Sequence, residues 1–180
     1  MTRIYFVRHG ESEYNKLKRY AGTIDSPLTG LGKEQAKETG ALLKNKNITH
    51  ILSSSLSRAP DTPIEIKNII DVENDIPLEL TSLLQEVNFG DIQDKAYDDT
   101  KSLTHGITSG TGDSAETLIE RAQKFLKLLE QTETSGNILV VGHGVFSSVI
   151  FAIKEGRSEN NLIEYINQWP FHNGQIKELL

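Results

Sequence analysis

Two short apolar runs in this chain end at the same His-Gly step. They are residues 3–10, with the sequence RIYFVRHG, and residues 137–144, with the sequence NILVVGHG. Continuous apolar runs of this kind are typical of strands buried on both faces of a parallel sheet, and a glycine permits the sharp turn toward a following helix. Because parallel strands share a direction, we expect His9 and His143 to lie at the carboxyl edge of one sheet, where open α/β folds place their ligands.

The chain between and after these runs alternates helix and strand patterns. Thr29 is a predicted N-cap of a helix to about Lys44, and Thr62-Pro63-Ile64-Glu65 predicts the start of the next helix, because it combines a capping threonine with a proline at the first helical position. Arg58 would then lie in the preceding turn. The other predicted elements are a strand at 49–53, a strand or loose apolar segment at 78–84, helices starting near 114 and spanning 145–153, and a late edge strand at 175–180. This alternation predicts an α/β domain.

Composition limits the class of protein. The 180 residues are 37% hydrophobic, which suits one domain spanning 1–180. The absence of cysteine excludes disulfides, thiolate metal sites and cysteine nucleophiles. A net charge of -6 disfavours nucleic acid and anionic lipid as partners. Without a signal peptide or an apolar run long enough to span a bilayer, we expect a soluble, cytoplasmic protein that does not bind membranes.

Two polar segments are candidates for functional loops. Residues 11–26 follow the first His-Gly step and form a long connection, which is often functional at a strand's carboxyl end. Residues 91–112 carry glycines at 106, 110 and 112 and predict an insertion or flap that sets specificity. The late edge strand would also allow two subunits to pair, so a homodimer is one open alternative for the oligomeric state.

Arginines beside the two histidines distinguish between the uses that imidazoles have. Histidine serves as metal ligand, as acid or base, or as nucleophile toward phosphorus. Arg8 adjoins His9, and two guanidiniums would repel a divalent cation but suit the oxygens of a phosphate. We therefore expect no metal. A phosphoryl site needs a nucleophile, donors and an acid, and His9, the group of Arg8, Arg58 and His143, and either Glu86 or Glu11 would fill these roles.

These residues also match a known family. Arg8-His9-Gly10-Glu11-Ser12, followed by Asn15, resembles the Arg-His-Gly-Glu-Thr signature of the histidine phosphatase superfamily, which includes the cofactor-dependent phosphoglycerate mutases. Residues 25–36, 53–62, 84–90 and 141–144 are similar to further motifs of the family, in the family's order. The resemblance covers nearly the whole chain. It implies a three-layer α/β/α fold with a mostly parallel central sheet, as in the phosphoglycerate mutases.

The resemblance assigns a role to each motif residue. His9 would attack phosphorus and become phosphorylated, and Glu86 would protonate the departing alcohol, although Glu11 stays open as the acid. Arg8, Arg58 and His143 would hold the phosphoryl oxygens. Asn15, Gly22 and the amide of Gly144 would contact the same phosphate, and no metal or cofactor is implied.

The resemblance implies a metal-independent phosphomonoester hydrolase acting on a small phosphorylated metabolite. The alternatives are a phosphoglycerate mutase-type isomerase and a non-catalytic phosphate-binding or scaffold protein. Family mutases are typically longer, with a C-terminal tail over the site, and this chain ends directly after its last predicted strand, which favours the phosphatase. Ala21 and Ser148 depart from the family pattern; Ser148 stands where many relatives carry arginine or lysine, which disfavours a polyanionic substrate.

Overall fold

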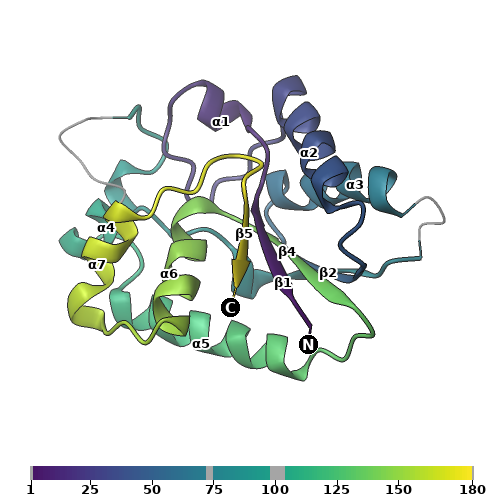
Figure 1. The fold of residues 1–180 in the computed structure, drawn as a ribbon. Coiled ribbons are helices and arrows are strands. Elements are labelled where there is room, and N and C mark those ends of the chain that lie inside the picture. The colour runs from purple at the N-terminus through teal and green to yellow at the C-terminus, as the bar shows by residue number, and fades with distance from the viewer. Residues whose placement is uncertain (1, 72–74, 98–103, 180) are drawn as a thin grey trace.

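A five-stranded sheet runs through the molecule, whose computed structural model describes residues 2–71, 75–97 and 104–179 (Figure 1). The strands are β1 (Ile4–Arg8), β2 (Ile48–Ser54), β3 (Leu78–Thr81), β4 (Asn137–Gly142) and β5 (Ile176–Leu179), in the spatial order β3-β2-β4-β1-β5. The strand pairs β1–β4, β2–β4 and β2–β3 are parallel, and β5 pairs with β1 in the antiparallel direction at the edge. The predicted mostly parallel sheet is therefore confirmed.

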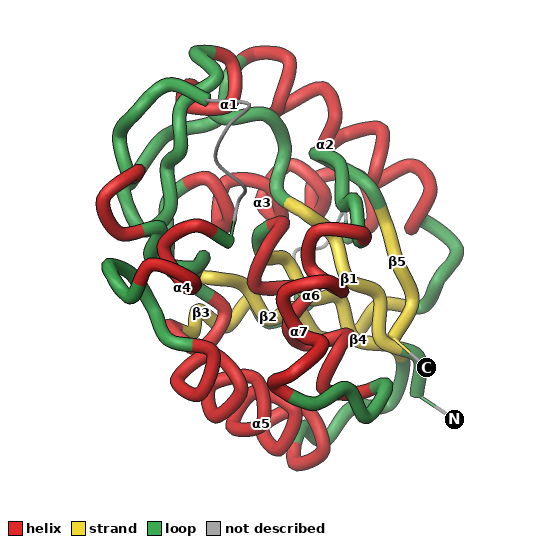
Figure 2. Tube along the Cα trace, turned by 90° about the vertical axis from the view of Figure 1, so that its left-hand side faces the viewer, coloured by secondary structure: helices red, strands yellow, loops and turns green. Residues whose placement is uncertain are grey.

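Helices cover both faces of this sheet. They are α1 (Glu13–Lys16), α2 (Gly30–Leu43), α3 (Arg58–Ile70), α4 (His105–Ser109), α5 (Ala115–Gln131), α6 (Gly144–Lys154) and α7 (Glu159–Gln168), with 3₁₀ turns at Ser82–Leu84 and Gly90–Ile92. In Figures 1 and 2, α2 and α3 lie on one side of the strands and α5, α6 and α7 on the other. The predicted three-layer α/β/α fold is confirmed.

Alternation along the central strands builds two cores. Tyr5 and Val7 of β1 pack on one face with buried residues of α2 and α3. Phe6, between them in sequence, packs on the other face with Phe125 of α5 and Phe151 of α6. Successive side chains of a strand point to opposite faces, so a run that is apolar at every position serves both layers.

Strand register brings the two His-Gly steps together. Arg8 of β1 lies opposite Gly142 of β4, and the amide of His9 donates to the carbonyl of Gly142 at 3.0 Å. Both strands therefore release the chain at the same edge of the sheet, near α1 in Figure 1. This is the carboxyl edge that the two apolar runs predict.

Local capping agrees with the predicted start of two helices. Thr29 is the N-cap of α2, and its Oγ1 accepts a hydrogen bond from the amide of Gly32 at 3.0 Å. Ser114 caps α5 in the same way, with Oγ accepting from the amide of Thr117 at 3.1 Å. Each of these hydroxyls satisfies an amide that the first helical turn leaves unpaired.

The predicted start of α3 is wrong. The helix begins at Arg58, four residues before the predicted cap, and carries Pro63 inside it. A carboxylate from another loop makes this possible: Oδ1 of Asp25 accepts from the amide of Ser57 at 2.8 Å, directly before the first turn. The Oγ1 of Thr62, freed from capping, donates to the carbonyl of Arg58 at 2.9 Å. Tertiary contacts thus outweigh the cost of an internal proline, which is about 3 kcal/mol.

Helix α7 and the described part of the predicted flap at 91–112 add to the predicted elements. Helix α7 has no counterpart among them, because only Leu162 and Ile166 of its sequence, ENNLIEYINQ, are buried. Of the predicted flap, residues 98–103 lie outside the described residues. In the described part, a Cβ on Gly106 would stand 2.5 Å from the carbonyl of Phe89, and one on Gly112 would stand 2.1 Å from that of Asn88. These glycines permit close packing against the loop that follows Glu86.

Within the described ranges, no helix combines the length and the apolar character that crossing a bilayer requires.

Candidate active site

A pocket of about 540 Å³ opens at the carboxyl edge of the sheet. Residues from five separate parts of the chain line it: Arg8, His9, Asn15, Tyr20, Ala21, Gly22, Arg58, Glu86, Phe89, Tyr97, Gly144, Val145, Ser148, Ile166, Asn167, Trp169, Pro170, Phe171 and His172. Most of the residues predicted for the site are in this set. The lining does not include His143 or the alternative acid Glu11, which were also predicted for the site.

His9 stands at the end of β1 with its imidazole 3% exposed. Its Nδ1 lies 2.6 Å from the carbonyl oxygen of Gly10, so the ring proton is on Nδ1 and this atom donates. Nε2 then keeps its lone pair, and Nε of Arg58 donates to it at 3.3 Å. The arrangement presents a nucleophilic nitrogen with its orientation fixed by the backbone.

Both imidazoles of the site are neutral at physiological pH. Burial, followed by the charges of Arg58 and Arg8, holds the pKa of His9 well below its ordinary value of 6.5, and the bond to Gly10 opposes this only in part. Burial and the charge of Arg58 likewise hold the pKa of His143 well below 6.5. A neutral imidazole is the form that can attack phosphorus.

Arg58 is the largest fully buried side chain and is 2% exposed. Nη1 donates to the carbonyl of Ile24 at 2.8 Å, Nη2 donates to the carbonyl of Gly22 at 2.7 Å, and Nε faces His9. Burial lowers the pKa of Arg58, and the negative charge of Glu86 opposes that shift. An arginine held by two backbone carbonyls keeps one edge of its guanidinium directed at Nε2 of His9.

Arg8 approaches the same point from β1. Nη1 donates to the carbonyl of Phe171 at 2.6 Å, whereas its buried Nε makes no hydrogen bond to the described residues. A Cβ on Gly144 would stand 3.4 Å from the guanidinium carbon of Arg8. The guanidinium therefore packs over the first residue of α6, at the positive end of that helix, where an anion is favoured.

His143 is completely buried beside His9, with the two ring centroids 5.1 Å apart. Its Nε2 lies 2.8 Å from Oγ of Ser54, at the last position of β2. Nδ1 is buried and has no hydrogen-bond partner among the described residues. Ser54 was not predicted from the sequence, because nothing in a run of three serines marks which one meets the second imidazole.

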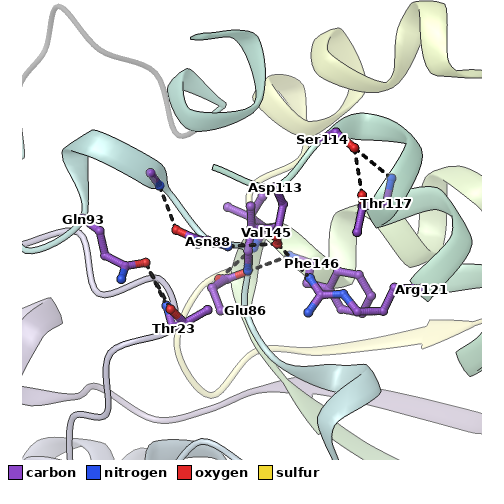
Figure 3. A network of polar contacts seen from close by, with 12 residues as sticks. Thr23, Glu86, Asn88, Gln93, Asp113, Ser114, Thr117, Arg121, Val145 and Phe146 are labelled. Atoms are coloured by element: carbon purple, nitrogen blue, oxygen red, sulfur yellow. Dashed lines mark hydrogen bonds and ion pairs between the residues drawn. The ribbon is translucent and has the colours of Figure 1, made fainter. Parts of the chain in front are cut away.

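Glu86 sits against the first turn of α6. Oε1 accepts from the amides of Val87 at 2.9 Å and Phe146 at 2.8 Å, and Oε2 accepts from the amide of Val145 at 3.2 Å. Figure 3 shows these contacts, with Glu86 below the start of α6. The carboxylate is 7% exposed and lines the pocket. The unpaired amides at a helix N-terminus fix the orientation of such a group.

A second group of polar residues backs this carboxylate. The guanidinium of Arg121 lies 3.9 Å from the ring centroid of Phe146, and its Nη2 is 3.5 Å from Oδ2 of Asp113. The same Oδ2 accepts from the amide of Asn88 at 3.0 Å. These contacts, also visible in Figure 3, tie the loop after Glu86 to α5 and α6.

Glu11, the other candidate acid, lies outside the pocket lining. Its carboxylate Oε1 accepts from Oγ1 of Thr29 at 2.8 Å, and its amide donates to Oε1 of Gln35 at 2.8 Å. Both contacts hold the loop after His9 against α2. The geometry therefore favours Glu86 over Glu11 as the group that meets a ligand.

Asn15 reaches the pocket from α1 with a fixed carboxamide. Its Oδ1 accepts from the amide of Ser12 and from Nδ2 of Asn173, each at 3.2 Å, so Nδ2 is the end available to a ligand. Asn173 also donates to the carbonyl of His9 at 2.9 Å. Asn173 was not predicted as a site residue, because it is 164 residues from His9 in sequence and no motif surrounds it.

Gly22 lines the pocket with a left-handed backbone, at φ +54°. Its carbonyl accepts from Arg58, and a Cβ at this position would stand 2.2 Å from Oε1 of Gln93. The absence of a side chain at Gly22 therefore allows the loop to pass between the side chains of Arg58 and Gln93. Ser148, also in the lining, is 1% exposed and donates from Oγ to the carbonyl of Val145 at 2.6 Å.

The described residues contain no group of three or more histidines, aspartates or glutamates placed to hold a metal ion. The polar groups that line the pocket include two guanidiniums, the imidazole of His9, the carboxylate of Glu86 and the carboxamide of Asn15. These are groups that bind and transfer a phosphoryl group.

Known proteins are similar to this chain in sequence and in fold. A sequence profile of the histidine phosphatase superfamily (branch 1) matches residues 4–179. The probable phosphoglycerate mutase GpmB of Salmonella arizonae is 31% identical over 156 residues, which cover 81% of this chain and 71% of that protein. The Escherichia coli protein of the same name gives the same values.

Solved structures extend the likeness in fold. A mycobacterial glucosyl-3-phosphoglycerate phosphatase, solved with VO3, superposes with a TM-score of 0.82 at 21% identity, covering 99% of this chain and 92% of that one. The alpha-ribazole phosphatase of Shigella flexneri gives a TM-score of 0.79 at 23% identity, covering 98% and 89%. Since the profile spans nearly every residue and a relative exceeds 30% identity over most of the chain, this protein belongs to the histidine phosphatase superfamily, branch 1.

Proposed function

We propose that this protein is a metal-independent phosphomonoester hydrolase that works through a phosphohistidine on His9. One observation carries the proposal: Nε2 of His9 is kept unprotonated at the pocket wall by the hydrogen bond from Nδ1 to Gly10, while Arg58 lies 3.3 Å away. A neutral nucleophile beside a fixed cation is what attack on a phosphate dianion requires.

In the first step, Nε2 of His9 attacks phosphorus and the bond from phosphorus to the ester oxygen breaks. Glu86 enters this step protonated and gives its proton to the departing oxygen. We assign the proton to Oε2, because Oε1 already accepts two amide hydrogen bonds. The alcohol leaves, and the phosphoryl group stays on His9.

In the second step, water attacks phosphorus and Glu86 removes the proton from that water. The bond between phosphorus and Nε2 breaks, which releases inorganic phosphate and restores neutral His9. Glu86 ends protonated, ready for the next ester. One carboxyl group thus serves both steps as acid and then as base.

The remaining residues bind the charge that develops on the phosphoryl oxygens. Arg8 and Arg58 supply guanidinium donors, Asn15 supplies Nδ2, and Gly144 supplies the first amide of α6. His143 donates from Nδ1 once a phosphoryl group reaches it, and Gly22 positions Arg58 through its carbonyl. Loss of one such donor in a hydrolase costs about 2.7 to 4 kcal/mol of transition-state stabilisation.

The substrate is a small phosphate monoester, handled by the protein in the cytoplasm. Proteins of similar fold are named as a glucosyl-3-phosphoglycerate phosphatase and an alpha-ribazole phosphatase, which supports hydrolysis. The relative named as a probable phosphoglycerate mutase supports isomerisation as the second candidate. A mutase would convert 3-phosphoglycerate to 2-phosphoglycerate without releasing phosphate.

Phosphate release from p-nitrophenyl phosphate, measured with and without EDTA, tests the proposal. We expect turnover that EDTA leaves unchanged and vanadate inhibits. His9→Ala should show no turnover, whereas His50→Ala, which changes a histidine paired with Glu79 on the sheet, should keep it. Rapid acid-free quenching of the wild type should reveal an acid-labile, alkali-stable phosphoryl group that is missing from His9→Ala.

Other outcomes point to the alternatives. Vanadate binding without release from a broad panel of phosphate esters would indicate a phosphate-binding protein. Interconversion of phosphoglycerates faster than phosphate release would indicate a mutase. Turnover that requires a divalent metal would overturn the metal-independent mechanism.

A further inference from the structure

The pocket lining has two chemically distinct parts. One part, built from Arg8, His9, Arg58, Glu86 and Asn15, carries the polar groups assigned above to the phosphoryl group. The other part is mostly apolar and consists chiefly of aromatic side chains: Tyr20, Phe89, Tyr97, Ile166, Trp169 and Phe171. The second part is where the alcohol portion of an ester would lie.

The phosphoryl group of a substrate would by itself neutralise the positive charges of the pocket lining. A phosphate monoester carries about two negative charges at neutral pH. Arg8 and Arg58 are the only lysine or arginine side chains among the described residues of the lining, so two positive charges face the phosphoryl group. A second anionic group on the substrate, such as a carboxylate, would be desolvated without a counter-charge, which is unfavourable.

Neighbouring cations do not supply that charge. Nζ of Lys177 lies 3.3 Å from the ring centroid of Trp169 and is not part of the lining. Arg19 is paired with Asp94 at 3.0 Å. The ammonium group of Lys177 is held against the indole of Trp169, and the guanidinium of Arg19 is held by the carboxylate of Asp94. Neither cation is therefore placed to bind a substrate anion inside the pocket.

Aromatic rings shape the apolar part from two sets of elements. Tyr20 lies against Phe89 and Tyr97, with ring centroids 6.1 and 4.8 Å away. Hydrogen bonds between residues 18–20 and 94–97 join their two loops, including the amide of Tyr20 to the carbonyl of Lys95 at 2.9 Å.

The second set follows α7. Trp169 packs against Phe151, Tyr165 and Phe171, with ring centroids 4.7, 6.3 and 5.2 Å away. Its neighbours fix the orientation of the indole, and both Trp169 and Phe171 line the pocket. Fixed rings bind a flat apolar group at little entropic cost, with offset or edge contacts.

We propose that the preferred substrate is the phosphate monoester of an uncharged alcohol that bears an aromatic ring. This inference rests on the proposed hydrolase function and assigns the substrate class of the same pocket. It predicts poor use of phosphate esters that carry a carboxylate, the phosphoglycerates among them. It concerns the alcohol portion and leaves the chemistry at phosphorus unchanged.

Two matched pairs of esters test the two halves of this inference. Benzyl phosphate and ethyl phosphate both release an alkanol, so their kcat/KM ratio reports ring binding; we expect benzyl phosphate to be favoured by about tenfold or more. 4-Carbamoylphenyl and 4-carboxyphenyl phosphate have similar shapes and differ in charge. We expect the neutral amide to be favoured by about tenfold or more.

Two lysine substitutions on α7 give a matched control. Asn167 is exposed and lines the pocket, whereas Gln168, the next residue, is exposed and does not. Asn167→Lys adds a cation at the pocket. It should therefore reduce, several-fold, the ratio of kcat/KM for the carbamoyl ester to kcat/KM for the carboxyl ester. Gln168→Lys should leave the ratio as in the wild type.

A ring substitution completes the design. Tyr97 is 45% exposed, so Tyr97→Ala should fold normally, and it should reduce the preference for benzyl over ethyl phosphate. Failure of every ester in the panel would contradict the hydrolase function itself. Turnover with no preference for the ring, or with preference for the carboxylate esters, would overturn the substrate class while the hydrolase function stands.

Discussion

Oγ of Ser54 lies 2.8 Å from Nε2 of His143, where β2 ends beside β4. The same Oγ accepts from the amide of Leu56 at 3.3 Å. Among the described contacts of this hydroxyl, Nε2 of His143 is the one acceptor for its proton, so we assign the imidazole proton to Nδ1. In this tautomer the second imidazole can donate to a phosphoryl oxygen from Nδ1, the nitrogen that has no partner among the described residues.

Ser54→Ala should lower kcat about tenfold or more, because the imidazole of His143 loses the bond that selects its tautomer and a buried nitrogen is left unpaired. KM should change less, since Arg8 and Arg58 still bind the ester. Ser53→Ala is the matched control: Ser53 is also completely buried, but its Oγ contacts only the carbonyl of Ser54, at 3.3 Å. Equal losses of kcat in both variants would argue against a role in setting the tautomer.

The identity of the acid can be tested through the leaving group. Glu86→Gln cannot protonate the departing oxygen, so kcat/KM, which reports the first step, should fall steeply with alkyl esters and much less with p-nitrophenyl phosphate, whose alcohol leaves without a proton. Glu11→Gln keeps an acceptor for Thr29 and should behave like the wild type with every ester. The assignment of the acid reverses if Glu11→Gln, and not Glu86→Gln, shows the dependence on the leaving group.

Buried neutral histidines should make stability depend on pH. Burial and the charge of Arg58 hold the pKa values of His9 and His143 well below 6.5 in the folded protein, whereas the unfolded chain takes up both protons near pH 6.5. The unfolded state then binds more protons below that pH. The free energy of unfolding should therefore fall as pH drops below 6.5, by up to about 1.4 kcal/mol per pH unit for each histidine.

Urea unfolding at a series of pH values between about 5 and 7 measures this slope, and it compares the wild type with His143→Gln. The variant lacks one of the two histidines and should show a flatter decline. Asp71 and Asp94 do not interfere, because contacts in the folded protein lower their pKa values from 3.8, and stability from those groups is lost only in stronger acid. Identical slopes for wild type and variant would contradict the prediction for His143.

Much of the fold could be predicted because burial dominates the sequence pattern of its central elements. The runs that became β1 and β4 are apolar at almost every position, and α5 places Leu118, Ala122, Phe125 and Leu129 on one buried face. The site motifs at His9 and Arg58 follow predicted strand ends, so their common edge could be inferred from topology.

Contacts between distant loops could not be predicted in this way. The start of α3 depends on Asp25, which is 32 residues away from the amide of Ser57 that it accepts from. The sequence around Thr62 favours this residue as the cap and contains no information about the contact with Asp25. Asn173 and Ser54 were missed for the same reason: each acts on a residue far away in sequence and is chemically ordinary in its own segment.

Asn173→Ala should reduce kcat/KM about five- to tenfold through two lost hydrogen bonds. Nδ2 of Asn173 joins the carbonyl of His9 to Oδ1 of Asn15, so its removal frees the carboxamide of Asn15, for which we propose a contact to the phosphate. A net hydrogen bond contributes about 0.5 to 1.5 kcal/mol, which matches this range. Asn160→Ala, an exposed asparagine in α7, should leave kcat/KM unchanged, and a comparable loss there would count against the linking role.

The last prediction concerns the contact that seats the nucleophile loop on α2. A Cβ on Gly10 would stand 2.2 Å from the carbonyl oxygen of Gly32, and one on Gly32 would stand 2.1 Å from that of Glu11. These partners are backbone atoms, so a methyl group at either glycine must displace the loop itself. Gly32→Ala should lower the free energy of unfolding by about 1 to 3 kcal/mol or more and lower kcat as well, because the displaced loop carries His9.

Gly30→Ala is the control for Gly32→Ala within the same helical turn. A Cβ on Gly30 would meet nothing within 4 Å, and alanine is favoured over glycine in a helix by up to about 1 kcal/mol. Urea unfolding should therefore show Gly30→Ala to be as stable as the wild type or more stable, with unchanged kcat. Wild-type stability and kcat in Gly32→Ala would mean that the loop after β1 can move to accept the added methyl group. The inference that tight packing of this loop against α2 fixes the position of His9 would then be wrong.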